Sequence, residues 1–597
     1  MLRSRNFIRA VLFLSGLSAV LFSLVVTNAG YAAFLLGDSA KDLSFGPTLF
    51  RALLFFHGIL LIAVSVFLNR PAIAVREAAA KNKNLQTTRS TLIGLFVLCV
   101  IALALRIWNL NADLWVDEVF TLLDFVRQPM GEILTSFPSQ NQHLLYSILA
   151  HFTTAVFGES AWALRLPAVL FGVASIWALF LLGRNLLGTR AALLTCALMT
   201  VSYHHIWFSQ NARGYTGLLF FTLLSTWLWF EALEKNKRVW WLGYAAAVVG
   251  GMWVHMTMAF VVASHGFLHV TLLLLPNLSG DAKERVSIER QAGAKPFAAW
   301  ILSVTVTLQV YAFALPEFLV SGLHEESKNS EWTNPLWVLT ETLANLSIGF
   351  AGIGVVLIGA AFVVFGWCSL FKKNRRAAIL MILPPFFAGS LMLALGHNLF
   401  PRFFFFAMGF GLLIVIYGTI ELPKVFSGFI KALRSNSFAD LAGASLAMLL
   451  ILVSLITVPR NYALPKQNFS GAKTYVENNR LPGEKVIAVN IAGEVYSRYF
   501  APQWLVAKSE TELRNLEQNS GKIWLVYTLS PEIKAFRPEL WWMIERHYKI
   551  VRVFPGTLNG GEIFVCRNIT DEERNNESSQ NFWKSENNSV RQTALER

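Results

Sequence analysis

Long apolar runs separated by short basic segments constrain the fold of this chain more than any other sequence feature. A helix needs about 20 apolar residues to cross the ~30 Å hydrocarbon core of a bilayer, and many stretches here reach that length. Hydrophobic residues make up 54% of the 597 and charged residues only 15%, which is more apolar surface than soluble cores can bury. The sequence therefore predicts an α-helical polytopic membrane protein.

The basic segments set the predicted topology, because loops rich in Lys and Arg stay in the cytoplasm. The net charge of +14 lies in these short loops, so it indicates topology, and we expect no nucleic acid partner. We expect about 13 spans, at 7–27, 48–68, 91–108, 162–183, 190–207, 214–232, two within 239–276, 297–316, 344–370, 377–396, 402–420 and 440–458. This odd number puts the C-terminus outside. The first run also fits a cleaved signal peptide, because it has a basic start and ends in AGYAA.

The membrane part divides into two regions in this interpretation. Residues 1–90 form two added N-terminal transmembrane helices and a basic cytoplasmic linker, and residues 91–459 form the main transmembrane domain. The main domain has an external loop at 109–161, in which HLLYSILAHFTTAVFG (143–158) is too short to span and is predicted to be an interfacial or re-entrant helix.

The pattern changes after Arg460 to that of a soluble domain. KVIAVNIA, KIWLVYTLS, YKIVRVFPG and GEIFVCRNI have the composition of strands, and PELWWMIERH suits a helix. We therefore expect a small extracytoplasmic α/β domain at 460–568. Residues 569–597 are polar enough to form a disordered tail.

Two adjacent carboxylates, Asp117 and Glu118, lie in the external loop within NLNADLWVDEVFTLLDFV. They fit a solvated loop or the acidic first turn of a helix, whose N-terminus favours anions. They also fit a general base, because burial and a like-charged neighbour raise a carboxylate pKa toward neutral pH. Both interpretations stay open at this point.

The predicted outer face also collects basic and polar side chains. Arginine suits phosphate because its planar guanidinium makes two charge-assisted hydrogen bonds, although an arginine at an interface also extends its head group to water without binding anything. The candidate phosphate-binding residues are Arg165, Arg213 and Arg402, and the candidate substrate-binding residues are His143, Gln210, Asn211 and Tyr215.

Metal binding has little support in the sequence. No HExxH or comparable motif is present, and a lone histidine is more often a hydrogen-bonded packing residue. A divalent cation held by Asp117 or Glu118 together with His143 is the one cofactor that we keep open.

Three segments, LWVDE, QHLLYSILAHFTTAVFGESAWALRLPAVLFG and HHIWFSQNARGYTGLLFF, resemble the C-type integral membrane glycosyltransferases (GT-C enzymes) over roughly residues 91–275. That family includes protein O-mannosyltransferases and the bacterial enzymes that add sugars, aminoarabinose among them, to lipid A. LFPRFFFF is similar to the family's Pro-Arg-aromatic segment near the lipid donor. The family's usual His-Pro-Pro is His143-Leu144-Leu145 here.

The resemblance implies a GT-C-like fold and a polyprenyl-phosphate-linked sugar as donor. The acceptor would be a glycolipid, a polysaccharide or a protein, and the reaction would take place on the extracytoplasmic side of the plasma (inner) membrane. Asp117 inherits the role of general base and Glu118 a supporting role, while Arg213 and Arg402 would face the donor phosphate.

Two other classes of function compete with a glycosyltransferase. A transporter or flippase of lipid-linked glycans would need functional charges at mid-bilayer depth, whereas the notable charges here concentrate outside. A structural or partner-binding membrane protein would make its contacts through the C-terminal domain.

Overall fold

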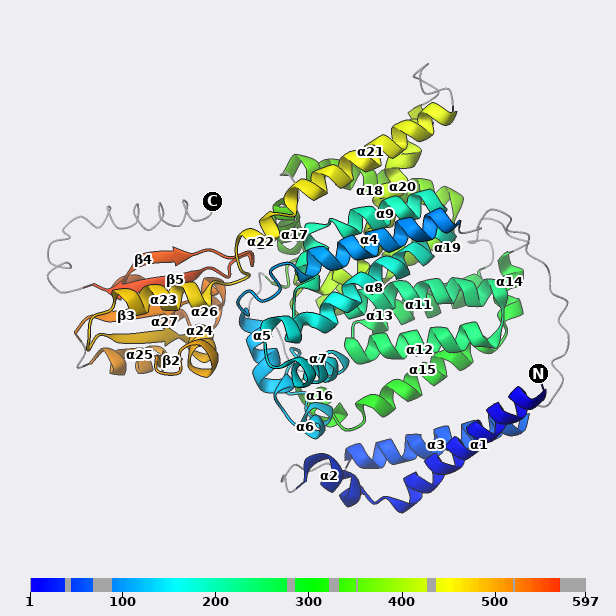
Figure 1. Ribbon diagram of the computed structural model, residues 1–597, viewed down its shortest axis with the longest axis horizontal. Helices are drawn as coiled ribbons and strands as arrows, with labels where there is room; N and C mark the ends of the chain where they lie inside the picture. Colours follow the sequence, from blue (N-terminus) through cyan, green and yellow to red (C-terminus); the bar gives the residue numbers. More distant parts are fainter. Residues whose placement is uncertain are drawn as a thin grey trace.

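The computed structural model describes residues 2–37, 45–67, 88–275, 285–321, 332–349, 353–426, 436–518 and 521–569. Most of the predicted basic linker and the predicted tail from residue 570 lie outside these ranges. Figure 1 shows a bundle of long helices with a small sheet domain at one end. The predicted fold class, a helical membrane protein with a small C-terminal α/β domain, is confirmed.

Nine helices within the described ranges are long and apolar enough to cross a membrane, or ten if one bent pair is a single span. They are α1 (Leu2–Val25), α3 (Phe45–Phe67), α4 (Arg89–Ile107), α8 (Ala161–Leu187), α11 (Tyr215–Lys235), α18 (Ile353–Lys373), α19 (Arg375–Ala394), α20 (Met408–Phe426) and α21 (Asn436–Thr457). The predicted count of 13 spans is not confirmed. The expected pair at 239–276 is present as α12 (Arg238–Val254) and α13 (Met258–Leu274), and the span expected at 297–316 corresponds to α15 (Lys295–Tyr311), each of 17 residues.

The span predicted at 190–207 corresponds to a bent pair of helices, α9 (Thr189–Thr200) and α10 (Tyr203–Ser209), between which the chain bends by 63°. The Ser202 hydroxyl caps α10 by accepting from the His205 N–H. The guanidinium of Arg106 on α4 donates to the carbonyl oxygens of Met199 and Thr200 at 3.2 Å each. A side chain that satisfies the freed carbonyls is a recognised cause of a break in a helix.

The N-terminal region packs as a separate helical hairpin beside the bundle, with a third short helix, α2 (Asn28–Leu36), between α1 and α3 (Figure 1). The crossing of α1 and α3 needs glycine, because a Cβ atom on Gly16 would lie 2.7 Å from the Gly58 carbonyl oxygen. His57 on α3 attaches the hairpin to α15 through Gln309 at 2.5 Å and Thr305 at 3.0 Å.

The loop between α4 and α8 folds into short helices at one end of the bundle. They are α5 (Val116–Phe120), which continues into a π-helix, η1 (Thr121–Val126), and then α6 (Met130–Thr135) and α7 (Leu144–Phe157). The 14 residues of α7 span about 21 Å, less than the hydrocarbon thickness of ~30 Å. The helix is therefore too short to cross a membrane, as the sequence predicted.

The C-terminal domain is a five-stranded mixed sheet in the order β2-β1-β3-β5-β4. Strands β1 (Lys485–Val489), β2 (Leu505–Ala507) and β3 (Ile523–Tyr527) are parallel, whereas β5 (Ile563–Asn568) pairs antiparallel with both β3 and β4 (Tyr548–Phe554). The predicted helix PELWWMIERH is α27 (Pro538–His547). The sequence prediction missed β2 and the other helices of this domain, α23 (Phe469–Asn479), α24 (Asn490–Val495), α25 (Glu510–Glu517) and α26 (Ser530–Phe536).

One apolar cluster joins the domain to the bundle. It includes Trp115, Val116 and Val119 from the external loop together with Phe469 and Trp524 from the domain, all nearly inaccessible to solvent. The domain and α5 therefore pack as neighbours at one end of the molecule, and the basic helix α14 (Arg285–Ala292) lies at the other end (Figure 1).

Candidate active site

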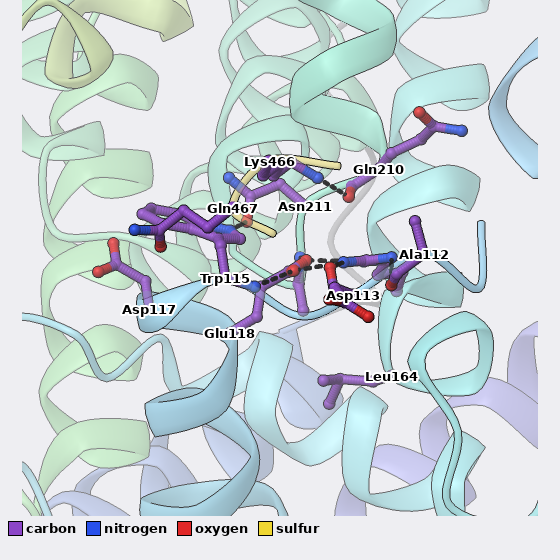
Figure 2. A network of polar contacts seen from close by, with 12 residues as sticks. Ala112, Asp113, Trp115, Asp117, Glu118, Leu164, Gln210, Asn211, Lys466 and Gln467 are labelled. Carbon is purple, nitrogen blue, oxygen red and sulfur yellow. Dashed lines mark hydrogen bonds and ion pairs between the residues drawn. The ribbon is translucent and has the colours of Figure 1, made fainter. Parts of the chain in front are cut away.

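Glu118 lies at the centre of a buried polar network at the start of α5 (Figure 2). Its side chain is completely buried and forms a two-pronged ion pair with Arg165 of α8, at 2.8 Å from Nε to Oε1 and 2.5 Å from Nη2 to Oε2. The backbone N–H groups of Ala212 (2.7 Å) and Trp115 (3.3 Å) donate to the same carboxylate. The bond from Trp115 is the helix-capping contact expected of an acidic first turn.

Arg165 uses its whole guanidinium in this network. Besides the two bonds to Glu118, it donates at 2.8 Å to each of three carbonyl oxygens, those of Leu110, Ala112 and Asp113. All five of its N–H groups are therefore occupied. The prediction that Arg165 binds the donor phosphate does not fit this arrangement, because the side chain holds the loop before α5 and has no donor left.

The segment that leads into the C-terminal domain completes the network from the opposite side. The Lys466 ammonium donates to the Gln210 carbonyl oxygen, and the Gln467 side chain accepts from the Val116 N–H at 3.0 Å. Burial tends to raise the pKa of Glu118, but Arg165, Lys466 and the hydrogen bonds outweigh it and lower that pKa. Burial also lowers the pKa of Lys466 to about 7. Glu118 is thus a fixed anion at neutral pH.

Asp117 points away from this network (Figure 2) and faces two arginines. Its Oδ2 atom lies 3.5 Å from Nη1 of Arg213 and 3.8 Å from Nη1 of Arg402. The Asp117 side chain is 19% exposed, so solvent and small groups reach it. A carboxylate, which can accept a proton, therefore lies beside two guanidinium groups that can bind an anion.

Both arginines have donor capacity to spare. Within the described residues, Nε and Nη1 of Arg213 and Nε of Arg402 are buried without a hydrogen-bond partner. The rings of Phe400 and Phe403, at 4.8 and 5.6 Å from the Arg402 guanidinium carbon, support it from the 3-10 helix η3 (Pro401–Ala407) and the residue before it. Buried donors that lack an acceptor are costly, so these two guanidinium groups are suited to bind an anion.

His143 and Tyr215 lie beside Arg213. The His143 ring is 4.7 Å from that of His255 and 5.7 Å from that of Tyr215. Burial and the charge of Arg213 lower the pKa of His143 well below its ordinary value, so the ring is neutral at pH 7. Gly214 permits this packing, because a Cβ atom there would lie 2.9 Å from Nδ1 of His143.

Gln210 and Asn211, both predicted to bind substrate, have structural contacts instead. The Gln210 amide donates to the carbonyl oxygens of Arg106 (3.0 Å) and Trp108 (2.7 Å) and accepts from Asn461 (2.7 Å). The Asn211 side chain accepts from the Trp115 indole at 3.0 Å. Gln210 therefore belongs to the junction with the C-terminal domain, whereas the buried amide nitrogen of Asn211 has no partner among the described residues.

Sequence reasoning missed three residues that position this site: Asp113, Lys466 and Gln467. Asp113 accepts from the backbone N–H and hydroxyl of Ser470 at 2.8 and 2.9 Å, which anchors the start of α23. Each of these contacts crosses from the membrane part of the chain to the segment after residue 460. No local sequence pattern predicts such contacts. The only sequence feature at this point is the polar pair Lys466 and Gln467 within ALPKQNF.

The residues considered for a divalent cation fit one poorly. Within the described residues, no group of three or more His, Cys, Asp or Glu side chains is arranged to hold a metal ion. Both oxygens of Glu118 are engaged by Arg165 and backbone N–H groups, and two guanidinium groups adjoin Asp117. We therefore derive no step through a metal.

The geometry defines a membrane-embedded helical protein with a carboxylate flanked by arginines at one end, and sequence comparison agrees with this class. Residues 141–278 match the family model described as dolichyl-phosphate-mannose-protein mannosyltransferase. His143, Arg213 and Tyr215 fall inside that match, and Asp117 and Arg402 fall outside it. The predicted resemblance to C-type glycosyltransferases is thereby confirmed over this stretch.

Among individual proteins, 107 residues are 31% identical to the putative mannosyltransferase YkcB of Bacillus subtilis (strain 168). This match spans 18% of the chain and only 15% of that relative. Among solved structures, ArnT from Cupriavidus metallidurans bound to undecaprenyl phosphate aligns with 12% identity and a TM-score of 0.44, over 81% of this chain and 99% of that one. AglB from Archaeoglobus fulgidus, in complex with an inhibitory peptide and a dolichol-phosphate, aligns with 10% identity and a TM-score of 0.43, over 80% and 74%.

Proposed function

We propose that the protein is a glycosyltransferase that moves a hexosyl or pentosyl unit from a polyprenyl-phosphate-linked donor to an acceptor of the cell envelope. The acceptor is a glycolipid, a polysaccharide or a protein. The observation that carries this proposal is the position of Asp117, 3.5 Å from Arg213 and 3.8 Å from Arg402. The family match over residues 141–278 supports it.

The proposed reaction is a direct displacement at the anomeric carbon. A hydroxyl oxygen of the acceptor attacks that carbon as Asp117 takes the hydroxyl proton, and the bond from the anomeric carbon to the phosphate oxygen breaks. The leaving polyprenyl phosphate is a stable anion, so it needs neutralising charge more than a proton. Arg213 and Arg402 supply that charge through their unused N–H groups.

The neighbouring residues act indirectly in this proposal. Glu118 and Arg165 fix the first turn of α5 and so hold Asp117 in place, because their ion pair is buried and bidentate. His143 and Tyr215 lie beside Arg213, and the Nε2 atom of His143, which has no hydrogen-bond partner within the part of the chain that the structure describes, is available to the sugar. In this proposal Glu118 and Arg165 position Asp117, Arg213 and Arg402 bind the phosphate, and His143 and Tyr215 contact the sugar.

We also propose that this end of the molecule is extracytoplasmic, in the plasma (inner) membrane. Two features support that orientation. The site and the C-terminal domain lie together at one end, and the basic helix α14 lies at the other (Figure 1). Basic loops favour the cytoplasm.

The test is mass spectrometry of envelope glycolipids, polysaccharides and glycoproteins from a deletion strain, complemented with wild type or Asp117→Asn at matched membrane levels. We expect one sugar-sized mass to vanish in the deletion strain and to return with wild type. Loss of a general base lowers the rate by roughly 10²–10⁴-fold, so Asp117→Asn should not restore it.

Asp124→Asn is the matched control, because Asp124 lies in the same loop and its ion pair with Arg498 is half-exposed. This control should restore the product fully. Restoration by Asp117→Asn would remove that residue from the mechanism. Translocation of labelled lipid without chemical change would favour the transporter hypothesis.

A further inference from the structure

A cleft lies between the start of the external loop and the segment that leads into the C-terminal domain. Its volume is about 300 Å³, at the lower end of the range for small-molecule sites. A narrow inner part of about 20 Å³ shares Asp113 and Tyr462 with it and reaches Arg165 and Lys466. A volume of this size holds one water molecule or one hydroxyl group. The residues that line the two parts include Asn109, Asp113, Trp207, Asn461, Tyr462 and Lys466.

The cleft is separate from the site around Asp117. Figure 2 shows Ala112 and Asp113, which line the cleft, on one side of Glu118, and Asp117 on the other. Within the described residues, the linings of both parts lack Asp117 and its two arginines. The function proposed above therefore leaves this cleft without a role.

Asn461 gives the narrow part an unused hydrogen-bond acceptor. The side-chain nitrogen of Gln210 donates to two backbone carbonyl oxygens, those of Arg106 and Trp108, which fixes the orientation of this amide. The Gln210 side-chain oxygen therefore faces Asn461 and accepts from its amide nitrogen at 2.7 Å. The Oδ1 atom of Asn461 is then left buried without a hydrogen-bond partner within the described residues. Asn461 is only 8% exposed, so an unsatisfied acceptor here is costly.

Lys466 adds hydrogen-bond donors to the same narrow part. Its side chain is buried, and its ammonium group donates to the Gln210 carbonyl oxygen. An ammonium group has three N–H bonds, and this one makes no other hydrogen bond within the part of the chain that the structure describes. A hydroxyl group both donates and accepts. It is therefore complementary to Lys466 together with Oδ1 of Asn461.

The wider part of the cleft favours a neutral ligand over an anion. The carboxylate of Asp113, held by Ser470 at 2.8 and 2.9 Å, repels negative charge, and Arg165 has spent its donors on Glu118 and backbone carbonyl groups. The ring of Trp207, whose Nε1–H donates to the Thr557 hydroxyl at 3.0 Å, adds a flat apolar surface. Aromatic rings with a few placed polar groups are typical of sites for small organic ligands.

The cleft opens where two helices with exposed apolar faces end. Helix α4 ends at Ile107, and Trp108, which is 68% exposed, directly precedes the cleft residue Asn109. Helix α21 ends shortly before Asn461. The exposed apolar side chains of the two helices include Phe96, Val100, Ile107, Leu452 and Ile456. An exposed tryptophan at the end of an apolar span is typical of the membrane–water interface, so a head group in the cleft would have its lipid chains beside α4 and α21.

We propose that this cleft is a second ligand site, which binds the neutral sugar head group of a membrane-anchored glycolipid. One hydroxyl group of the sugar occupies the narrow part, where it donates to Oδ1 of Asn461 and accepts from Lys466, and the sugar ring packs against Trp207. This binding does not require that Asp117 transfers a sugar. It gives the junction between the membrane bundle and the C-terminal domain a ligand of its own.

The test measures binding alone, without a sugar donor. The probe is a galactosyl diacylglycerol that carries a photoreactive diazirine on its sugar, and the full-length protein is held in phosphatidylcholine nanodiscs. After irradiation, mass spectrometry locates the labelled peptides.

Two variants probe the two parts of the cleft. Ala463→Trp fills the wider part from an exposed position without removing a polar group, and Asn461→Leu removes the acceptor of the narrow part. Ala155→Trp is the matched control, because it makes the same change at an exposed alanine of α7. The Tm of each variant is also measured, since Asn461→Leu removes the donor to Gln210 as well.

We expect the label in peptides from residues 109–113 and 461–470, and unlabelled galactosyl diacylglycerol should compete with it. Ala463→Trp should abolish this labelling, and Ala155→Trp should leave it unchanged. Asn461→Leu should raise the glycolipid fraction needed for half-maximal labelling by roughly 2–10-fold, as expected for one lost hydrogen bond. If Asn461→Leu fails to fold, Ala463→Trp decides the question.

Three outcomes would overturn the proposal or part of it. Labelling that is spread over the exposed faces of the helices, or that survives Ala463→Trp, would show that the cleft is not the site. Equal competition by anionic phosphatidylglycerol would refute the neutral sugar as ligand, and equal competition by soluble methyl galactoside would refute the lipid anchor. None of these results depends on Asp117, so a failure of the proposed function is recognised separately, by product restoration with Asp117→Asn.

Discussion

Replacing Arg165 with methionine tests whether this residue holds the site together or binds the donor. The side chain is 3% exposed and its partner Glu118 is fully buried. The change removes both bonds to Glu118 and leaves three backbone carbonyl groups without their donor. Glu118 keeps only its two backbone donors and the charge of Lys466. Removing one partner of a buried ion pair costs about 3–5 kcal/mol, so we expect Arg165→Met to be destabilised by that amount.

The assay is thermal unfolding of purified protein in detergent, followed by intrinsic fluorescence. The entropy of unfolding is about 2.1 cal/mol/K per residue, so for a chain of 597 residues a loss of about 3–5 kcal/mol corresponds to a decrease in Tm of roughly 2–4 °C. Arg127→Met is the matched control, because its ion pair with Glu159 is 43% exposed on both sides and such pairs contribute at most about 1 kcal/mol. The double variant Glu118→Gln with Arg165→Met should regain part of the loss, since it removes the carboxylate that Arg165→Met leaves buried without its ion-pair partner.

Two results would refute this reasoning. One is a decrease in Tm for Arg165→Met no larger than that for Arg127→Met. The other is a folded Arg165→Met protein with normal Tm but greatly weakened donor binding, which would return Arg165 to the phosphate-binding residues.

Three further changes test other parts of the site. Arg213→Gln should lower kcat/KM for the donor by roughly 10–100-fold, because a charge-assisted hydrogen bond to the donor is lost. It should not lower Tm, because two of the three guanidinium nitrogens have no hydrogen-bond partner within the described residues. A decrease in Tm with normal kinetics would contradict this expectation. The pKa of Lys466 is about 10.4 in unfolded chains and about 7 in the fold. The unfolded state therefore binds more protons between these two values, and the free energy of unfolding increases with pH there by up to about 1.4 kcal/mol per pH unit. Unfolding measured at pH 7 and pH 9 should show that Lys466→Met loses this increase. Gln467→Leu leaves the Val116 N–H without its acceptor, at a cost of about 1–3 kcal/mol. Proteolysis between the membrane bundle and the C-terminal domain should therefore become faster. Unchanged proteolysis would show that the hydrogen bond between Gln467 and Val116 is dispensable.

The sequence allowed the helical membrane class and the general location of the site to be predicted, because both depend on local composition. Length and hydropathy identify a span, and charged residues at span ends are conspicuous against an apolar background. Asp117, Arg213 and Arg402 were selected on that basis, and the structure brings both guanidinium groups within 4 Å of the Asp117 carboxylate.

The sequence could not distinguish arginines whose donors are occupied from those whose donors are unused. Arg165 and Arg213 look alike in sequence, yet the first donates five hydrogen bonds, whereas two nitrogens of the second make no hydrogen bond within the described residues. Gln467 gave no local signal either, because its contact with Val116 joins positions that are 351 residues apart in the chain. The break at Ser202 depends on Arg106 from another helix in the same way.

The bridge between Val116 and Gln467 has a consequence for biosynthesis. The two residues are 351 positions apart, which a ribosome covers in roughly 18–70 s at 5–20 residues per second. For that interval the nascent loop lacks the partners that Gln467, Lys466 and Ser470 supply to Val116, Gln210 and Asp113. The earliest-made part of the site is thus completed only by a domain that is translated later, and a chain terminated before that domain would insert its helices without assembling the site.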